Sequence, residues 1–291
     1  MGGGRLLKID VVMIVKDDAR YVADSLESLY SHVPVNRLLV VDGGSRKTVL
    51  DVVKRYPNVT LIDDSGGTRA TARQKGIEIV VTDWFMFLDS DVVLCDDWFE
   101  KVSKYMNDSE VGAVQGVDIP QCDEFQKFNN LIKEVSCSSP ISFKPIHMGL
   151  PVVNGIFIGD TLIRREAVKG IKIPPLLHVY EDRYIRRYIE DRGYRWVISS
   201  EAYCFHYSHR KSIDAYYLGL IDTLAGYRSI GKYFRDAPKL LVSFILASIM
   251  DQRTATKCFN LLLHNIAGSV AARLHVGSIS DAGFLKKLEG Y

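Results

Sequence analysis

Two acidic residues, Asp89 and Asp91, stand one residue apart directly after the apolar run of residues 84–88. Side chains two positions apart share a face of a strand, so both carboxylates can point the same way at the strand's carboxyl end, where open α/β sheets bind ligands. Paired carboxylates repel each other unless a cation joins them, and hard oxygen ligands favour Mg²⁺ or Mn²⁺. Taken alone, the triplet is better explained as a solvated turn before the helix expected near residue 96.

Two further segments could bind a nucleotide. Asp42 lies in the turn of residues 40–45, where its carboxylate could accept hydrogen bonds from a base or a sugar, and where glycines permit close backbone approach. Arg69 and Arg73 are four residues apart at the start of an expected helix, so they share a face that could meet a phosphate. The structural alternatives are a plain strand-to-helix turn and a solvated basic stripe.

Three residues in the second half of the chain could complete a site. Glu181 and Asp182 begin an expected helix, where acidic residues often serve only as favourable partners of the helix dipole. His206 directly follows an apolar strand and could reach the same pocket as Asp89 and Asp91, although a single histidine is more often structural. None of these features assigns a chemistry by itself.

The elements that carry these residues alternate between strands and helices in the first half of the chain. Apolar runs rich in β-branched residues predict strands, and apolar residues at helical spacing predict the helices between them. The alternation predicts an α/β fold with a mostly parallel sheet covered by helices. The expected strands are residues 9–15, 37–41, 59–62 and 84–88, and the expected helices are residues 19–30, 47–56 and 69–80.

The second half is less regular. Residues 136–151 contain Ser, Pro and Gly and predict a loop that borders the substrate. The same criteria predict strands at residues 111–117, 152–163, 195–198 and 202–205, and helices at residues 124–135 and 181–191.

The last 80 or so residues predict three helices, at residues 212–234, 238–250 and 254–276. Residues 240–250 are apolar on nearly every side, but this segment is too short to cross a bilayer, which needs ~20 residues. With Arg235, Lys239 and Arg253 beside it, the segment suits a helix lying in a membrane surface. A helical bundle that packs on the rest of the chain or forms a homo-oligomer explains the pattern equally well.

Composition narrows the classes of function. A net charge of +2 gives no electrostatic case for nucleic acid binding. Five widely spaced cysteines without a C-x-x-C pair argue against zinc and against a disulfide framework, and indicate a reducing compartment. The first residues lack the apolar core of a signal peptide. We therefore expect a cytoplasmic protein, or one held peripherally on the inner face of the cell membrane.

The motifs together resemble those of the inverting glycosyltransferases of family 2, which have the GT-A fold. The resemblance runs in the correct order over roughly residues 9–210 and leaves the remaining third uncovered. Its motifs are residues 14–20, the end of the first strand that contacts the nucleotide; residues 41–45, the V-D-D-G-S turn; residues 72–76, the A-R-N-x-G helix; residues 89–91, the D-x-D signature; residues 155–165, the segment before the acceptor site; Glu181 and Asp182, the E-D motif, with Gly193 after it; and His206, a further metal ligand.

This resemblance implies a sugar transfer from a UDP, GDP or dTDP sugar to a hydroxyl or phosphate of a glycan or a lipid-linked acceptor. Asp182 would be the catalytic base, with Glu181 the next choice. Asp91, Asp89 and His206 would hold Mn²⁺ or Mg²⁺. The donor-binding residues that it implies are Val15, Lys16, Asp42, Arg69, Arg73, Asp89 and Ser90.

Three residues depart from the family pattern. Gly43 replaces the second acid of the V-D-D-G-S turn, so that Asp42 alone must make any contact with the base. Asp18 and Gln74 stand where Asn is common.

The resemblance also predicts a division of the chain. Residues 1–210 would be the catalytic domain, with a nucleotide-sugar half at about 1–95 and an acceptor half at about 96–210. Residues 211–291 would be a helical region that contacts the membrane through residues 236–276 or mediates dimerisation. Two alternative functions remain at this stage: a sugar-phosphate nucleotidyltransferase, which the absence of glycine from residues 14–20 disfavours, and an inactive nucleotide-sugar-binding protein.

Overall fold

The computed structural model describes residues 8–17, 20–121, 157–207, 212–224, 241, 244–245, 248–249 and 251–274. These residues fall into two compact units. The first holds the described residues up to 121 together with those from 157 to 207, and the second holds the described residues from 212 onward. The proposed domain boundary near residue 210 stays a prediction.

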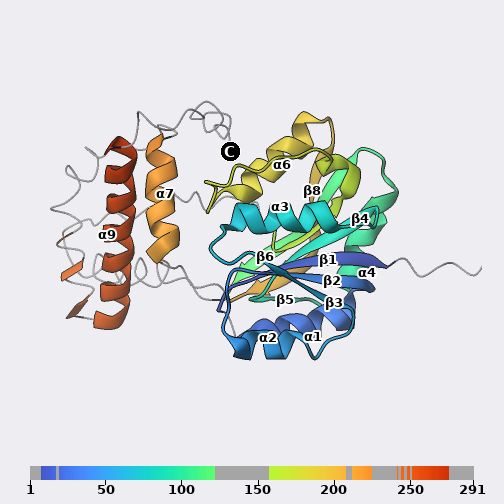
Figure 1. Ribbon diagram of the computed structural model, residues 1–291, viewed down its shortest axis with the longest axis horizontal. Helices are drawn as coiled ribbons and strands as arrows, with labels where there is room; N and C mark the ends of the chain where they lie inside the picture. The colour runs from blue at the N-terminus through green and yellow to red at the C-terminus, as the bar shows by residue number, and fades with distance from the viewer. Residues whose placement is uncertain are drawn as a thin grey trace, which may run out of the picture. The chain divides into compact units, whose positions relative to one another are not determined.

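The first unit begins with four parallel strands (Figure 1). They are β1 (Ile9–Val15), β2 (Val35–Asp42), β3 (Val59–Asp63) and β4 (Trp84–Asp89). The helices between them are α1 (Val22–His32), α2 (Lys47–Val53) and α3 (Arg69–Ile79), and α1 and α2 cover the face of the sheet opposite to α3 (Figure 1). The predicted alternation of strands and helices is confirmed.

The second half of this unit adds antiparallel neighbours to the same sheet. Its strands are β5 (Val92–Leu94), β6 (Val111–Pro120), β7 (Asp160–Arg164) and β8 (Arg195–His206), and its helices are α4 (Trp98–Ser103), α6 (Glu181–Asp191) and the 3₁₀ turns η1 (Lys104–Asn107) and η2 (Arg165–Val168). The strand order is β3-β2-β1-β4-β7-β6-β8-β5. β7 runs antiparallel to both β4 and β6, β6 and β8 are parallel, and β5 runs antiparallel to β8.

The core lies along the central strands. Val11, Val12 and Met13 of β1 and residues 85–88 of β4 have no solvent exposure, since helices cover both faces of the sheet. Strands buried on both faces carry continuous apolar runs. The polar residues that end these strands are therefore held at the edge of a rigid layer.

Two details differ from the sequence-based expectations, and two expected elements are not tested. In the described part of the predicted strand of residues 152–163, which begins at residue 157, the strand starts at Asp160, and Asp89 N–H donates to the Gly159 carbonyl (3.0 Å) just before it. The strands expected at 195–198 and 202–205 form one strand, β8, whose pairing with β6 shifts register between Gln115 and Val117. The expected helix at 124–135 and the loop at 136–151 lie outside the described residues.

The second unit contains two long helices, α7 (Ser212–Leu224) and α9 (Gln252–Leu274), which lie side by side (Figure 1). Residues 241, 244–245 and 248–249 are also helical, in the segment where residues 238–250 were expected to form a helix. In the part of the chain that the structure describes, no helix combines the length and the apolarity that crossing a bilayer requires.

Candidate functional site

The candidate site lies at the carboxyl ends of the parallel strands. In the sheet register, Val15 is the neighbour of Asp42, Asp42 is the neighbour of Asp63, and Ile14 is the neighbour of Asp89. Parallel strands in register end at the same edge, so residues from three separate motifs meet there. This is the edge at which open α/β sheets bind ligands.

Arg73 and Asp89 form a tight ion pair at this edge. The Nη2 atom of Arg73 lies 2.5 Å from the Asp89 carboxylate, and the guanidinium lies over the ring of Phe87, 4.6 Å from its centroid. Arg73 is 1% exposed, and among the described residues its Nε and Nη1 atoms have no hydrogen-bond partner. Buried donors are normally paired, so these atoms suit an anionic ligand. The alternative of a solvated basic stripe is wrong for Arg73.

His206 lies between two carboxylates. Its Nε2 atom is 3.6 Å from Asp91 Oδ1, and its Nδ1 atom is 3.3 Å from Asp118 Oδ1. The pairing of β5 with β8 produces this arrangement, because Val92 is the neighbour of His206. Burial alone would lower the pKa of His206, but the hydrogen bond to Asp118 and the negative charges nearby raise that pKa.

The Asp91 carboxylate and the His206 imidazole could bind a cation whose remaining coordination positions are filled by a bound ligand. Neighbouring ligands of an octahedral ion at ~2.1 Å lie ~3 Å apart, which a small movement of Asp91 or His206 would reach. In residues 8–17, 20–121, 157–207 and the described part of the second unit, no three His, Cys, Asp or Glu side chains are grouped to hold a metal ion by themselves. Mg²⁺ sites in nucleotide-using enzymes often have one or two protein ligands, with phosphates supplying others. Asp91 and His206 would be those protein ligands.

Asp118 was missed by the sequence-based reasoning. It lies in β6, in no recognisable motif, and reaches His206 only because β6 pairs with β8. A carboxylate on the second nitrogen of a metal-binding histidine fixes the tautomer and the direction of the ring. Asp160 was also missed. It is fully buried beside Trp98 Nε1 (3.4 Å), and burial raises its pKa well above the ordinary value.

The acidic pair Glu181 and Asp182 begins α6, after Tyr180 in a left-handed conformation (φ 69°). Burial, and then the charge of Asp182, raise the pKa of Glu181 to about 8, while the charges of Arg69 and Arg73 oppose this rise. Burial also raises the pKa of Asp182, while the hydrogen bond from the backbone N–H of Arg183 and the charges of the nearby arginines lower it by less. The charges of two arginines of α3 thus act on the acidic pair at the start of α6, and both helices cover the same face of the sheet (Figure 1). Glu181 is only 5% exposed, so it is not a solvated residue that merely interacts with the helix dipole.

We expect Glu181→Gln to reduce the pH dependence of stability. The folded protein holds a proton on Glu181 up to about pH 8, whereas the unfolded chain loses it near 4.5. The contribution of this carboxyl to stability is thus full below pH 4.5 and is lost as pH rises through about 8, on the order of 5 kcal/mol. Urea unfolding across that range should show a smaller loss for Glu181→Gln than for the native protein, and the loss that remains belongs to Asp182, whose pKa is also raised. Glu190→Gln, which removes an ion-paired acid from the same helix, is the control and should retain the loss.

Gln74 connects α3 to the segment that leads into α6. Its Nε2 atom donates to the Ile171 carbonyl (3.2 Å), and its Oε1 atom accepts from Ile173 N–H (3.0 Å). Arg69 donates to the His178 carbonyl (3.3 Å). Gln74 thus has a structural task at the position where the family commonly has Asn.

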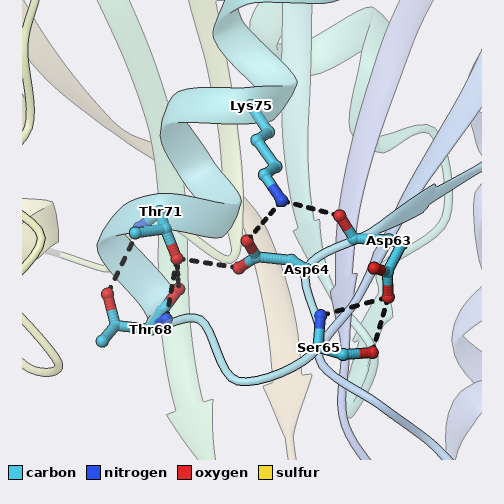
Figure 2. A network of polar contacts seen from close by, with 6 residues as sticks. All are labelled: Asp63, Asp64, Ser65, Thr68, Thr71 and Lys75. Atoms are coloured by element: carbon cyan, nitrogen blue, oxygen red, sulfur yellow. Dashed lines mark hydrogen bonds and ion pairs between the residues drawn. The ribbon is translucent and has the colours of Figure 1, made fainter.

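A polar network fixes the start of α3 (Figure 2). The Asp64 carboxylate accepts from Thr71 Oγ1 (2.8 Å) and pairs with Lys75 Nζ (2.7 Å), and Lys75 also donates to the Asp63 carbonyl (2.6 Å). Thr68 and Thr71 cap the helix reciprocally. The network ties α3 to the end of β3, which sets the position of the arginines that α3 carries.

We expect Gly67→Ala to destabilise the protein by about 1–3 kcal/mol, since overpacked sites must shift. A Cβ atom at Gly67 would lie 2.1 Å from Asp64 Oδ2 and 2.5 Å from Thr71 Oγ1. Urea unfolding measures the loss. Gly66→Asn is the matched control, because no atom lies near Gly66 and asparagine tolerates its positive φ. Equal destabilisation by the two substitutions would contradict the role given to the network.

The other predicted donor-binding residues lie at the same edge. Val15 is buried at the end of β1, Lys16 is exposed beside Gly43, and Ser90 is buried. Asp42 Oδ1 accepts from Ser45 N–H (2.8 Å), so this carboxylate caps its own turn. Its contact with a base stays a prediction. Asp18 and residue 155 lie outside the described residues.

Comparison with known proteins gives a consistent result. The sequence model of glycosyl transferase family 2 matches residues 10–171. An uncharacterized glycosyltransferase of Haemophilus influenzae is 26% identical over 178 residues, which are 58% of this chain and 67% of that protein.

Three solved structures share the fold. The mannosyltransferase PcManGT of Pyrobaculum calidifontis, in complex with GDP-Man and Mn²⁺, has a TM-score of 0.54 and 18% identity over 96% of this chain and 79% of its own. TarS residues 1–349 of S. aureus give a TM-score of 0.53 and 12% identity, over 92% and 91% of the two chains. The structure of GalNAc-T7 with UDP, GalNAc and Mn²⁺ has a TM-score of 0.51 and 12% identity. The match covers 72% of this chain and 45% of GalNAc-T7.

Proposed function

Since the chain belongs to glycosyl transferase family 2, we propose that it is an inverting, metal-dependent enzyme that moves a sugar from a nucleoside-diphosphate sugar to an acceptor hydroxyl or phosphate. Its GT-A fold and its membership of a glycosyltransferase family are the premise. The observation that carries the proposal is the grouping of the Arg73–Asp89 pair, His206 with Asp91, and Glu181 with Asp182 in the same unit.

The Arg73 guanidinium and the Asp91–His206 pair are suited to the diphosphate of the donor. Arg73 has two buried donor atoms without a partner among the described residues. A cation held by Asp91 and His206 would neutralise the charge that grows on the departing diphosphate. Two of the similar structures contain Mn²⁺ with GDP-Man or with UDP, which supports a nucleotide-sugar donor and a divalent metal. GDP, UDP and dTDP all remain candidates.

Asp182 is proposed as the catalytic base. Its raised pKa makes the carboxylate a better proton acceptor, and general bases work best with a pKa near the operating pH. Burial raises the pKa of Glu181 to about 8, so Glu181 holds its proton firmly and is the less suitable member of the pair for accepting one. Asp182 takes the proton of the acceptor hydroxyl while the hydroxyl oxygen bonds to the anomeric carbon. The diphosphate leaves from the opposite face with the bonding electrons, which inverts that carbon.

Membership of the glycosyltransferase family removes the nucleotidyltransferase alternative. An inactive binding protein would be expected to lack Asp91 or Asp182, and the chain retains both. The acceptor is proposed only by class, as a hydroxyl or phosphate on a glycan or a lipid-linked carrier.

The test is an incubation with UDP, GDP and dTDP sugars, in the presence of Mn²⁺ or Mg²⁺, without an acceptor. Glycosyltransferases can hydrolyse their donor slowly when water replaces the acceptor. We expect metal-dependent release of one nucleoside diphosphate. Release that is independent of the metal would contradict the metal assignment, and no release from any donor would contradict the proposal as a whole.

A further inference from the structure

We propose that α9 lies in the surface of an anionic lipid membrane. This inference goes beyond the proposed reaction and does not depend on the donor. Four large apolar side chains of α9, spaced by four, seven and four residues, share one face of the helix, which we call the apolar face of α9. Their exposed fractions lie between 41% and 78%, and they are Phe259, Leu263, Val270 and Leu274.

The opposite face of α9 holds α7 through small and polar residues. A Cβ atom at Gly219 of α7 would lie 1.9 Å from the Asn265 carbonyl oxygen of α9. A Cβ atom at Gly268 of α9 would likewise lie 1.9 Å from the Tyr216 carbonyl oxygen of α7. Asn265 Nδ2 donates to the Ala215 carbonyl (2.9 Å), and Ser269 Oγ donates to the Gly219 carbonyl (3.1 Å). Close glycine contacts with hydrogen bonds between helices are typical of helix pairs in lipid. The large apolar side chains of α9 are therefore directed away from its helical partner.

A second exposed apolar set lies in the same unit. Leu241, Ile245 and Ile249 recur at every fourth residue, and their exposed fractions are 54% to 78%. Phe244, from the same helical segment, packs edge-on against Phe259 with 5.2 Å between ring centroids. The two apolar sets thus belong to neighbouring segments. Contiguous exposed apolar surface marks an interaction site.

The positive charge of α9 indicates what covers its apolar face. Residues 252–274 include Arg253, Lys257 and Arg273 and contain neither Asp nor Glu. Exposed apolar and basic side chains on one helix suit a position among anionic lipid headgroups. In a symmetric dimer, the same patch would meet its own copy, and the cations of both copies would be brought together. A membrane surface is therefore favoured over a second copy of this chain.

The test is flotation of the full chain with phosphatidylcholine vesicles, with and without phosphatidylglycerol. We expect binding to the anionic vesicles, weakened by salt. Leu263→Gln with Val270→Gln should weaken this binding more than tenfold, since each change removes an exposed apolar side chain that the membrane would bury. The matched control, Asn260→Gln with His264→Gln, alters exposed positions outside the apolar face and should bind nearly as the native chain does. Arg253→Gln with Arg273→Gln should weaken binding to anionic vesicles by about fivefold for each arginine removed, and should not change binding to neutral vesicles.

Two outcomes would overturn the proposal. One is a native chain that does not float with anionic vesicles while light scattering shows a dimer that Leu263→Gln with Val270→Gln dissociates. This result would assign the apolar face to a second copy. The other is equal loss of binding in the apolar-face variant and in its control. Thermal unfolding by circular dichroism shows that each variant is folded, and donor hydrolysis, which is independent of vesicles, separates this proposal from the proposed reaction.

Discussion

Asp182→Asn is expected to lower the turnover number by about 10²–10⁴-fold while the dissociation constant of the donor stays within a few-fold of the native value. Asparagine keeps the size of the side chain, and its oxygen can still accept from the N–H of Arg183, which lies 2.7 Å from Asp182 Oδ1. The start of α6 should therefore be preserved. What the variant loses is the ability to accept a proton from the acceptor hydroxyl.

The pH profile of the native enzyme gives an independent check of the same role. Asp182 acts as a base only when it is deprotonated, so the rate should fall as pH decreases through its pKa. Because burial raises that pKa, the fall should begin at a higher pH than an exposed aspartate would give. Asp191→Asn, an exposed ion-paired position at the end of α6, is the control and should keep both the rate and the profile. Full turnover by Asp182→Asn would transfer the role of base to another group.

Much of the fold could be predicted from the sequence, because buried parallel strands leave a strong signal. The apolar runs that became β1 and β4 are buried except for the partly buried Ile14, and the residues at their ends were located to within one position. Asp42 and Asp89 each end a strand that pairs with β1 in parallel, so both lie at the edge where the ends of parallel strands are expected. β5 was not expected, because a strand of three residues leaves no periodicity.

The contacts that make the candidate site specific could not be predicted. Asp118 reaches His206 only through the pairing of β6 with β8, over 88 residues of sequence. The hydrogen bonds of Gln74 to residues 171 and 173 span a similar separation. Single side chains in such contacts leave no repeating pattern, so only the folded chain reveals them. For the same reason, Arg73 could not be told from a solvated residue before its burial was known.

Asp91→Ala is expected to lower the transfer rate by ~10³-fold or more and to weaken both Mn²⁺ and donor binding. The physical reason is the small number of groups that the described part of the chain offers to a cation. Among the described residues, Asp91 and His206 face each other. Without the Asp91 carboxylate, the His206 imidazole remains, and an imidazole that is neutral or positively charged cannot balance the charge of a metal ion. Titration of Mn²⁺ followed by electron paramagnetic resonance measures the metal directly, without turnover.

Asp96→Ala is the matched control for Asp91→Ala, since Asp96 is a highly exposed aspartate five residues further along, paired with His32 at the surface. It should bind Mn²⁺ and turn over as the native enzyme does. Removal of the metal with EDTA should reproduce the loss seen in Asp91→Ala and should be reversed by added Mn²⁺ in the native enzyme and in Asp96→Ala, but not in Asp91→Ala. If native activity survives excess EDTA, or if Asp91→Ala binds Mn²⁺ normally, the cation is held elsewhere or is not used. The acid pair Asp89 and Asp91 would then serve the sugar or the ribose alone, with the Arg73 guanidinium as the group that neutralises the diphosphate.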